Sequence, residues 1–245
     1  MASARAKVRL YVDSPLGQAQ SVALSQGQAH YLVSVMRLGP GDTVALFNGR
    51  DGEWTASLEL ASRKAAVVVC ERQAGPQADP PDLWLLFAPI KKARTDFIVE
   101  KAVEMGVRRI QPVQTRYTNA ERVRIDRLQA HAIEAAEQCG ATFVPEVAEI
   151  VRLDRLFGIW PQERRIMFCD ESRAGPSKVA WDSLGGSPAW AILIGPEGGF
   201  AADEVALVSG FPGSLAISLG PRILRADTAA VAALTLWQSH LGDWR

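Results

Sequence analysis

The chain has 245 residues, of which 48% are hydrophobic and 22% are charged, and its 27 Lys and Arg residues balance its 27 Asp and Glu residues. This composition is typical of one large globular domain or two small ones, and it excludes a disordered chain, which could not bury enough apolar surface to offset its conformational entropy. No apolar run reaches the roughly 18 residues that a membrane helix needs, and the N-terminal stretch has charges but no apolar signal core. We therefore expect a cytoplasmic protein that does not enter the membrane.

The first 72 residues are predicted to form a small β barrel with one short helix. Several short runs of β-forming residues are separated by Gly-, Pro- and Asn-containing turns, which is typical of an all-β domain. The runs are Lys7–Val12, Thr43–Phe47, Trp54–Leu60 and Ala65–Cys70, and the helix is expected over Gln28–Leu38. The Pro-rich segment 73–81 that follows can continue neither a helix nor a central strand, so we interpret it as a linker between two domains.

Residues 82–245 change character, because apolar runs now alternate with helical patterns. Such alternation predicts an α/β domain with a mainly parallel sheet. The expected strands are Leu83–Ala88, Ile110–Val113, Arg165–Cys169, Trp190–Ile194 and Ser214–Ser218. The expected helices are Arg94–Met105, Ile125–Cys139 and Ala226–Leu241.

Three loops of this second domain follow predicted strands, at the carboxyl ends where open parallel sheets bind ligands. They cover residues 169–173, 195–200 and 220–228, and the last two begin with Gly-Pro. The chain has no Walker sequence and no complete GxGxxG fingerprint, and acidic residues in the loops would repel phosphate. The acidic residues are Asp170, Glu171, Glu197 and Asp227. Such carboxylates suit ribose hydroxyls or a cationic ligand. S-adenosylmethionine fits both, because it has an adenosine, a positive sulfonium and no phosphate. The alternative interpretation is that these loops are tight turns whose carboxylates are solvated helix caps.

A basic stretch runs from Lys91 to Arg127, with ten Lys and Arg residues against five acidic ones. Phosphate backbones attract such stretches, although a helix face with solvated ion pairs is an equally good interpretation. The first domain adds His30 and Arg37 on its predicted helix.

Cysteine and histidine are scattered along the chain, with three of each. An odd number of cysteines without a close pair argues against a disulfide framework and against a Cys-rich zinc site. The sequence also has no HExxH motif, which excludes a zincin-type site. We therefore predict no metal.

Taken together, the two Gly-Pro loops resemble those of the ribosomal RNA small subunit methyltransferase E family. The resemblance rests on Ile194–Phe200 with Glu204 and on Leu219–Arg225, and it extends to His30–Asp42, Lys92–Val107 and Glu137–Gly140. Two positions depart from the family pattern. Ala141 stands where the family commonly has Arg, which removes a possible RNA contact, and Asp227 stands where it commonly has Glu, which keeps the charge.

The resemblance implies a SPOUT-type trefoil-knotted α/β methyltransferase domain over residues 82–245, with an N-terminal PUA-like β-barrel domain over residues 1–72. It implies a homodimer that binds S-adenosylmethionine in the knot, near the subunit boundary. It also implies that the substrate is the 16S ribosomal RNA of the 30S subunit, methylated at N3 of one uridine.

The resemblance also implies roles for individual residues. Those implied to bind the cofactor are Cys169, Ile194, Gly195, Glu197, Gly199, Leu219, Gly220, Ile223, Leu224 and Thr228. Arg225 is expected to stabilise negative charge on the uracil oxygens, and Asp227 is expected to act as a base or to orient Arg225. Those implied to bind RNA are His30, Arg37, Lys92, Arg94 and Lys101. For each charged residue, a structural salt bridge is the alternative.

Two other functions compete with this interpretation. A related SPOUT-like methyltransferase would act on another RNA or another atom. A non-catalytic RNA-binding or ribosome-assembly protein would bind RNA with a steep salt dependence but would have no affinity for S-adenosylmethionine.

Overall fold

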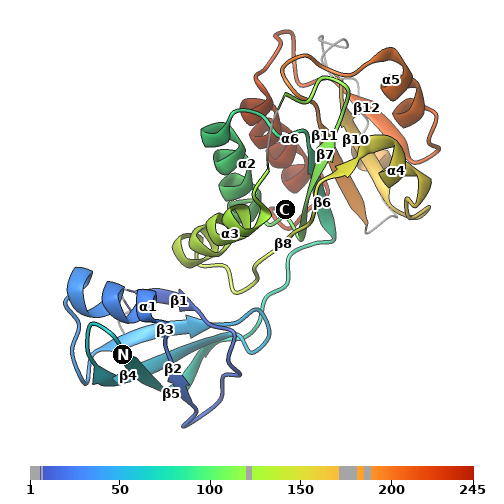
Figure 1. Ribbon diagram of the computed structural model, residues 1–245. Coiled ribbons are helices and arrows are strands. Elements are labelled where there is room, and N and C mark those ends of the chain that lie inside the picture. Colours follow the sequence, from blue (N-terminus) through green and yellow to red (C-terminus); the bar gives the residue numbers. More distant parts are fainter. Residues whose placement is uncertain (1–5, 7, 120–122, 171–180, 185–188) are drawn as a thin grey trace. The chain divides into compact units, whose positions relative to one another are not determined.

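The computed structural model describes residue 6 and residues 8–119, 123–170, 181–184 and 189–245, without the side chains of 182 and 183. The described residues form two compact units (Figure 1). The first contains Met1–Asp79 together with Ala136–Val144, and the second contains Pro80–Ala135 and Pro145–Arg245.

The first unit is a β domain with one helix, as predicted. Among its described residues, five strands form a sheet in the order β1-β3-β4-β5-β2, in which β1 and β3 are parallel and the other pairs are antiparallel. The strands are β1 (Arg9–Tyr11), β2 (Ser21–Ala23), β3 (Thr43–Phe47), β4 (Glu53–Ala61) and β5 (Ala66–Gly75). Alternating residues of these strands, such as Val44 and Leu46, are fully buried in one apolar cluster.

The helix of this unit begins two residues before the predicted start. Helix α1 (Gln26–His30) continues into a π-helical turn, Tyr31–Val35. Ser25 caps it, because its hydroxyl accepts from the Gln28 backbone N–H while the Gln28 side chain accepts from the Ser25 N–H.

The predicted linker is too long at its N-terminal end. Strand β5 continues to Gly75, because Gln73 pairs with Trp54 and Gly75 pairs with Glu53 in β4. The segment without a strand therefore begins after Gly75 and not at Gln73.

The second unit is built on a parallel sheet, as predicted. Its described strands lie in the order β12-β10-β11-β6-β7-β8, with β9 paired to β7. The strands are β6 (Leu83–Phe87), β7 (Arg109–Gln114), β8 (Glu146–Val147), β9 (Val151–Arg152), β10 (Arg165–Cys169), β11 (Trp190–Ile194) and β12 (Ser214–Ile217). The central strand β11 is apolar at every position and buried throughout, as expected for a strand covered on both faces.

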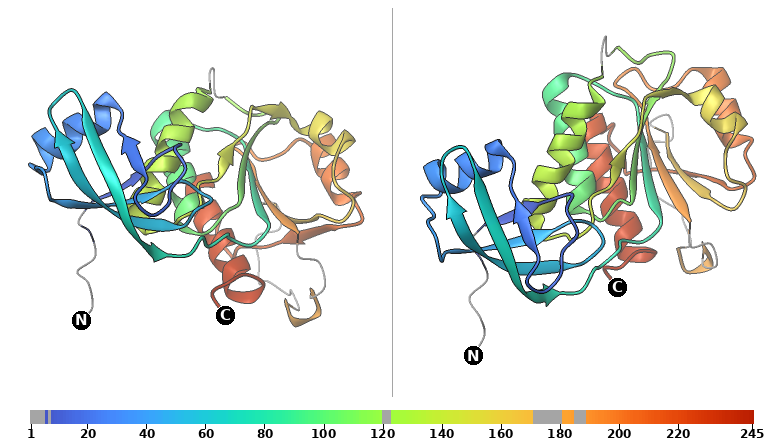
Figure 2. Two further views of the ribbon diagram at one scale, coloured as in Figure 1. Left: turned by 90° about the horizontal axis from the view of Figure 1, so that it is seen from below. Right: turned by 60° about the horizontal axis from the view of Figure 1, so that its bottom comes forward.

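Helices cover both faces of this sheet (Figures 1 and 2). The helices α2, α3 and α6 lie on one face, and α4 and α5 lie on the other. They are α2 (Lys92–Glu104), α3 (Ile125–Cys139), α4 (Leu153–Gly158), α5 (Ala202–Ser209) and α6 (Ala226–His240), with a 3₁₀ turn at Trp181–Leu184. Helix α2 packs against α6, and α4 packs against α5. No helix in the described ranges is long and apolar enough to cross a membrane.

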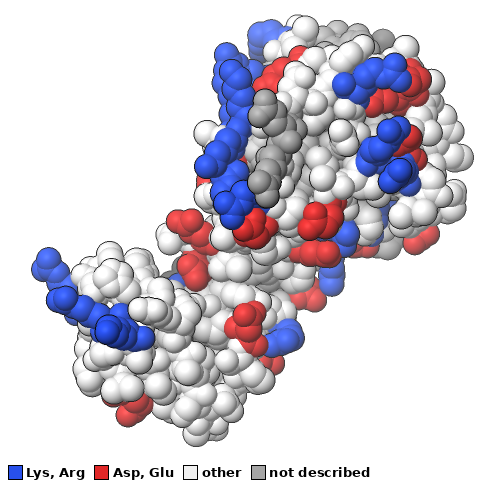
Figure 3. Space-filling model, viewed as in Figure 1, with Lys and Arg blue, Asp and Glu red and all other residues white. Residues whose placement is uncertain are grey.

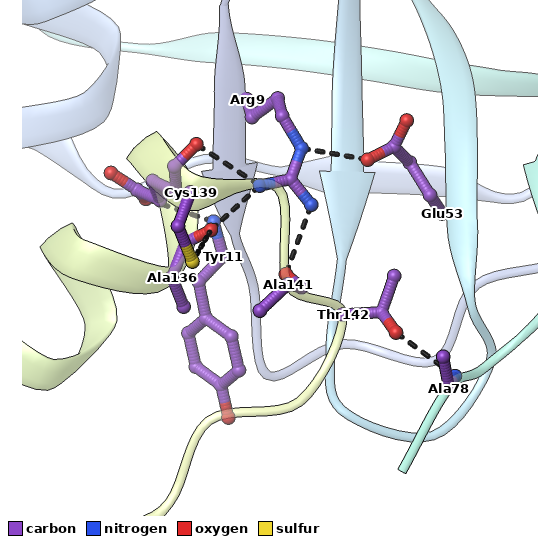
Figure 4. Close-up of polar contacts among 9 residues, drawn as sticks. Arg9, Tyr11, Glu53, Ala78, Ala136, Cys139, Ala141 and Thr142 are labelled. Atoms are coloured by element: carbon purple, nitrogen blue, oxygen red, sulfur yellow. Dashed lines mark hydrogen bonds and ion pairs between the residues drawn. The ribbon is translucent and has the colours of Figure 1, made fainter. Parts of the chain in front are cut away.

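The last turn of α3 belongs to the first unit, where Arg9 of β1 binds it (Figure 4). The Arg9 guanidinium donates to the carbonyl oxygens of Ala136 at 2.7 Å, Glu137 at 3.0 Å and Ala141 at 3.0 Å. Its Nε donates to the Glu53 carboxylate at 2.6 Å. These carbonyls lie at or just beyond a helix C-terminus, where a cation is favourable.

Candidate functional site

The register of the parallel sheet brings two of the three predicted loops side by side. Cys169 at the end of β10 pairs with Ile194 at the end of β11, so the chain leaves both strands at the same edge. The third loop leads into α6, which contacts β11. Cys169 and residues of the other two loops line a cavity of about 170 Å³. Its lining residues are Cys169, Ile194, Gly195, Pro196, Glu197, Gly199, Phe200, Ile223, Leu224, Arg225, Ala226 and Ala229.

Most of the residues predicted to bind the cofactor line this cavity. Three of them, Leu219, Gly220 and Thr228, do not. Five lining residues were not predicted to bind the cofactor: Pro196, Phe200, Arg225, Ala226 and Ala229. Phe200 ends the quoted Ile194–Phe200 motif, and its aromatic type could have indicated a cavity wall.

Two glycines are required by the shape of the loop 195–200. A Cβ atom on Gly195 would lie 2.6 Å from Cε2 of Phe200, which is closer than real contacts allow. Gly199 adopts a φ of 68°, in the left-handed region that side chains rarely enter, and its N–H closes a turn with the Pro196 carbonyl at 2.9 Å. The loop is therefore compact because it contains these glycines.

Arg225 and Asp227 lie at the beginning of α6 but in different surroundings. Arg225 is the exposed residue just before the helix, and it lines the cavity. Asp227, in the first turn, lies 3.5 Å from the guanidinium of Arg94 on α2, and its other oxygen accepts from the Thr228 N–H. The structural salt bridge that competed with a functional role is thus present for Arg94 and Asp227.

The other predicted RNA-binding residues are scattered. Lys101 pairs with Glu104 at 2.6 Å on the same helix. In the first unit, His30 and Arg37 are exposed, with the His30 ring 3.2 Å from the Ser34 hydroxyl. Lys92 lines a second cavity. Binding of RNA by these residues stays a prediction.

A second and larger cavity, of about 760 Å³, lies beside the first. Glu197 lines both cavities. The residues that line the larger one are Pro89, Ile90, Lys91, Lys92, Thr95, Asn119, Val123, Arg124, Arg127, Leu128 and Glu197. Figure 3 shows basic side chains in a row along the edge of the second unit that carries α2. The excess of basic residues over 91–127 in the sequence indicated this surface. Of the four cations that line the cavity, however, only Lys92 was predicted to bind RNA.

The first cavity contains a thiol that is held in its protonated form. Burial raises the pKa of Cys169 to about 12. Because the thiolate is the nucleophile, we expect iodoacetamide at pH 8 to alkylate Cys169 at least about 100-fold more slowly than a thiol of ordinary pKa. The exposed Cys139 is the internal control, and mass spectrometry of peptides measures both rates. Equal rates at the two cysteines would contradict the raised pKa of Cys169.

Ala141, one of the two departures from the family pattern, takes part in the Arg9 contacts through its backbone alone. Glu171, one of the loop carboxylates predicted to suit ribose hydroxyls or a cationic ligand, lies outside the described residues. Over the same described ranges, no group of three or more His, Cys, Asp or Glu side chains is placed to hold a metal ion.

Comparison with known families gives a class for this combination of fold and site. The family model of the RNA methyltransferase domain matches residues 77–238, and that of the RNA methyltransferase PUA domain matches residues 24–70. An α/β domain of this family joined to a PUA domain defines an RNA methyltransferase.

Curated relatives and solved structures narrow this class. A Rickettsia conorii protein named ribosomal RNA small subunit methyltransferase E is 30% identical over 92% of this chain and 93% of its own length. A Synechocystis protein of the same name is 30% identical over 87% of this chain and 71% of its own length. The crystal structure of ribosomal RNA small subunit methyltransferase E from Neisseria gonorrhoeae, bound to S-adenosylmethionine, is 29% identical with a TM-score of 0.87, covering 97% of this chain and 99% of that one. The chain belongs to the ribosomal RNA small subunit methyltransferase E family.

Proposed function

We propose that this protein uses S-adenosylmethionine to methylate N3 of one uridine in 16S ribosomal RNA. The observation that carries the proposal is the smaller cavity, which gathers seven of the ten residues predicted to bind the methyl donor. The Neisseria gonorrhoeae relative, whose fold is closely similar, binds this donor. The substrate of the named relatives supports a ribosomal RNA as the acceptor and the cytoplasm as the location.

The residues of the smaller cavity fit an adenosine better than a phosphate. Its walls are largely apolar, with Ile194, Phe200 and Leu224 available to the faces of a base, and glycine backbone lies at its edge. Glu197 would attract a sulfonium and repel a phosphate. Because about 170 Å³ is less than the roughly 300–1,000 Å³ of typical ligand pockets, the donor would extend beyond this cavity.

The residues at the start of α6 supply the electrostatics of the reaction. When bound, the donor supplies an electrophilic methyl group. N3 of uracil lies on the pairing edge and carries a weakly acidic proton, so the base must be unpaired to reach the site. Arg225 would stabilise the negative charge that develops on the uracil oxygens as this proton leaves. The pairing of Asp227 with Arg94 supports an orienting role for this carboxylate over the role of the base.

The trefoil knot and the homodimer are also part of the proposal. The side chain of Ile223, on the loop that lines the cavity, is 73% exposed, which supports a second copy of the chain covering it. In the same way, the PUA model match supports RNA binding by the N-terminal domain over residues 1–72. Light scattering after gel filtration is expected to give twice the mass of one chain, and a monomer at all concentrations would contradict the dimer.

The function is tested by incubating the protein with labelled S-adenosylmethionine and with either 30S particles or naked 16S ribosomal RNA. We expect label on one uridine, and mass spectrometry of nuclease fragments locates the methyl group. Calorimetry with the donor alone is the second measurement. A protein that binds RNA but shows neither donor binding nor transfer would be the non-catalytic alternative, and label on another base would be the related methyltransferase.

A further inference from the structure

The larger cavity combines the two surfaces that a nucleotide requires. Four cationic side chains, those of Lys91, Lys92, Arg124 and Arg127, line it. Its apolar part includes Ile90, which is 7% exposed, and Leu128, which is fully buried. A volume of about 760 Å³ lies within the range of ligand pockets. Cations beside an apolar wall suit a ligand that carries a phosphate and a flat base.

Local contacts hold the cavity wall in shape. The Thr95 hydroxyl is buried and bonds to both the N–H and the carbonyl of Ile90, each at 3.0 Å. These two bonds close the turn that carries Lys91 and leads into α2 at Lys92. On α3, Arg127 donates to the carboxylate of Asp96 at 2.5 Å.

The arginines remain able to bind a phosphate although both have acidic partners. Arg124 forms an exposed ion pair with Asp126 at 2.6 Å, and salt and water screen such pairs. A guanidinium has five N–H groups, so a carboxylate that accepts one or two of them leaves others available.

Among the described residues, Glu197 is the acidic side chain that lines the larger cavity, and it also lines the smaller one. A carboxylate accepts hydrogen bonds and donates none when it is ionised. Uracil presents an N–H at N3, whereas cytosine presents a lone pair there. At N3, a carboxylate therefore favours the N–H of uracil and repels the lone pair of cytosine.

We infer that the larger cavity binds the acceptor nucleotide, with its phosphate at the four cations and the N3–H of its uracil at Glu197. This inference rests on the proposed function. As the N3–H bond breaks, the proton passes to the Glu197 carboxylate and its electron pair stays on N3. That pair forms the bond to the methyl group, and the electrons of the broken sulfur–methyl bond return to sulfur, which becomes a neutral thioether. Glu197 then releases the proton to water.

Replacing Glu197 by glutamine tests the base-facing side of the cavity. We expect kcat of Glu197→Gln to fall about 100-fold or more, since general-base catalysis contributes on that order. S-adenosylmethionine should still bind, with a Kd raised by no more than about tenfold through the loss of the charge that attracts the sulfonium. An amide can also donate to cytosine. The unaltered protein should therefore discriminate against an RNA fragment with cytosine at the target position, and the variant should discriminate less. Unchanged kcat and unchanged discrimination would overturn the role of Glu197.

Replacing Arg124 by methionine tests the phosphate-facing side, and Arg152 provides a matched control. Arg124 and Arg152 are 60% and 61% exposed, and each pairs at 2.6 Å with an Asp two residues later. Only Arg124 belongs to the proposed cavity. We expect Arg124→Met to raise KM for the RNA about threefold to tenfold and to lower the slope of log affinity against log salt by about one. Donor affinity and kcat should stay unchanged, and Arg152→Met should match the unaltered protein.

The failure of this inference is distinguishable from the failure of the proposed function. If the unaltered protein methylates the RNA and the Arg124 and Arg152 variants have equal KM values, the cavity does not bind the phosphate and the function stands. If the unaltered protein transfers no methyl group, the proposed function fails. Binding of a labelled uridine-containing oligonucleotide then still decides whether Arg124, unlike Arg152, contributes to a nucleotide site.

Discussion

The variant Gly195→Val is expected to abolish binding of S-adenosylmethionine and, with it, methyl transfer. The added Cβ would lie 2.6 Å from Cε2 and 3.0 Å from Cζ of Phe200, so the ring must move. Phe200 itself lines the smaller cavity, which measures only about 170 Å³. A displaced ring or the valine methyl groups would therefore occupy the proposed site of the adenosine. Calorimetry should show a Kd at least about 100-fold weaker, which corresponds to roughly 3 kcal/mol.

A matched control for this variant is Gly158→Val. A Cβ on Gly158, at the end of α4 in the same unit, meets no atom within 4 Å, so the control adds the same side chain without a collision. It should retain normal donor affinity. Circular dichroism of both variants separates loss of the site from loss of the fold. Normal donor binding by a folded Gly195→Val protein would remove the loop 195–200 from the cofactor site.

The variant Arg9→Met is expected to lower the free energy of unfolding of the N-terminal unit by about 3–5 kcal/mol, the cost of breaking a buried ion pair. The Arg9 side chain is 7% exposed and that of its partner Glu53 is 17% exposed, so removal of the guanidinium leaves a largely buried carboxylate unpaired. It also leaves the carbonyls of Ala136, Glu137 and Ala141 without this donor. Amide hydrogen exchange over residues 136–144 should accelerate on the order of 100- to 1,000-fold.

Arg50 offers a control for the loss of a guanidinium. It is exposed, and its guanidinium donates to the Asp13 carbonyl at 3.0 Å, so Arg50→Met should change stability by less than about 0.5 kcal/mol. Similar exchange rates in the two variants would show that the Arg9 contacts contribute little.

Long apolar patterns predicted most of the sheet, whereas short strands escaped prediction. The ends of β10 and β11 are as predicted, because continuous apolar runs are bounded by turn residues. Strands β2, β8 and β9 have only two or three residues each, too few to show a period. Their pairing depends on neighbours from elsewhere in the chain, which local sequence does not encode.

The site was predictable as far as it depends on strand ends. The rule that ligands bind at the carboxyl ends of parallel strands brought Cys169, Ile194 and Gly195 together correctly. The pairing of Arg94 with Asp227 joins residues more than 130 positions apart, and it arises because α2 packs against α6. Likewise, the sequence could not show that Arg124 and Arg127, of all the cations in the basic stretch, line the larger cavity, because this depends on which face of the chain packs there.

The attachment of α3 to the N-terminal unit bears on the order in which the protein folds during synthesis. Arg9 and Glu53 are made early, but the carbonyls that Arg9 binds belong to residues 136–141, which emerge after strands β6 and β7 of the second unit. Until then, the Arg9 guanidinium has Glu53 and the ring of Phe47 as partners but lacks the three carbonyls. The N-terminal unit therefore completes its native contacts only when part of the methyltransferase domain has been translated, and cutting the gene at the linker would separate Arg9 from its partners on α3.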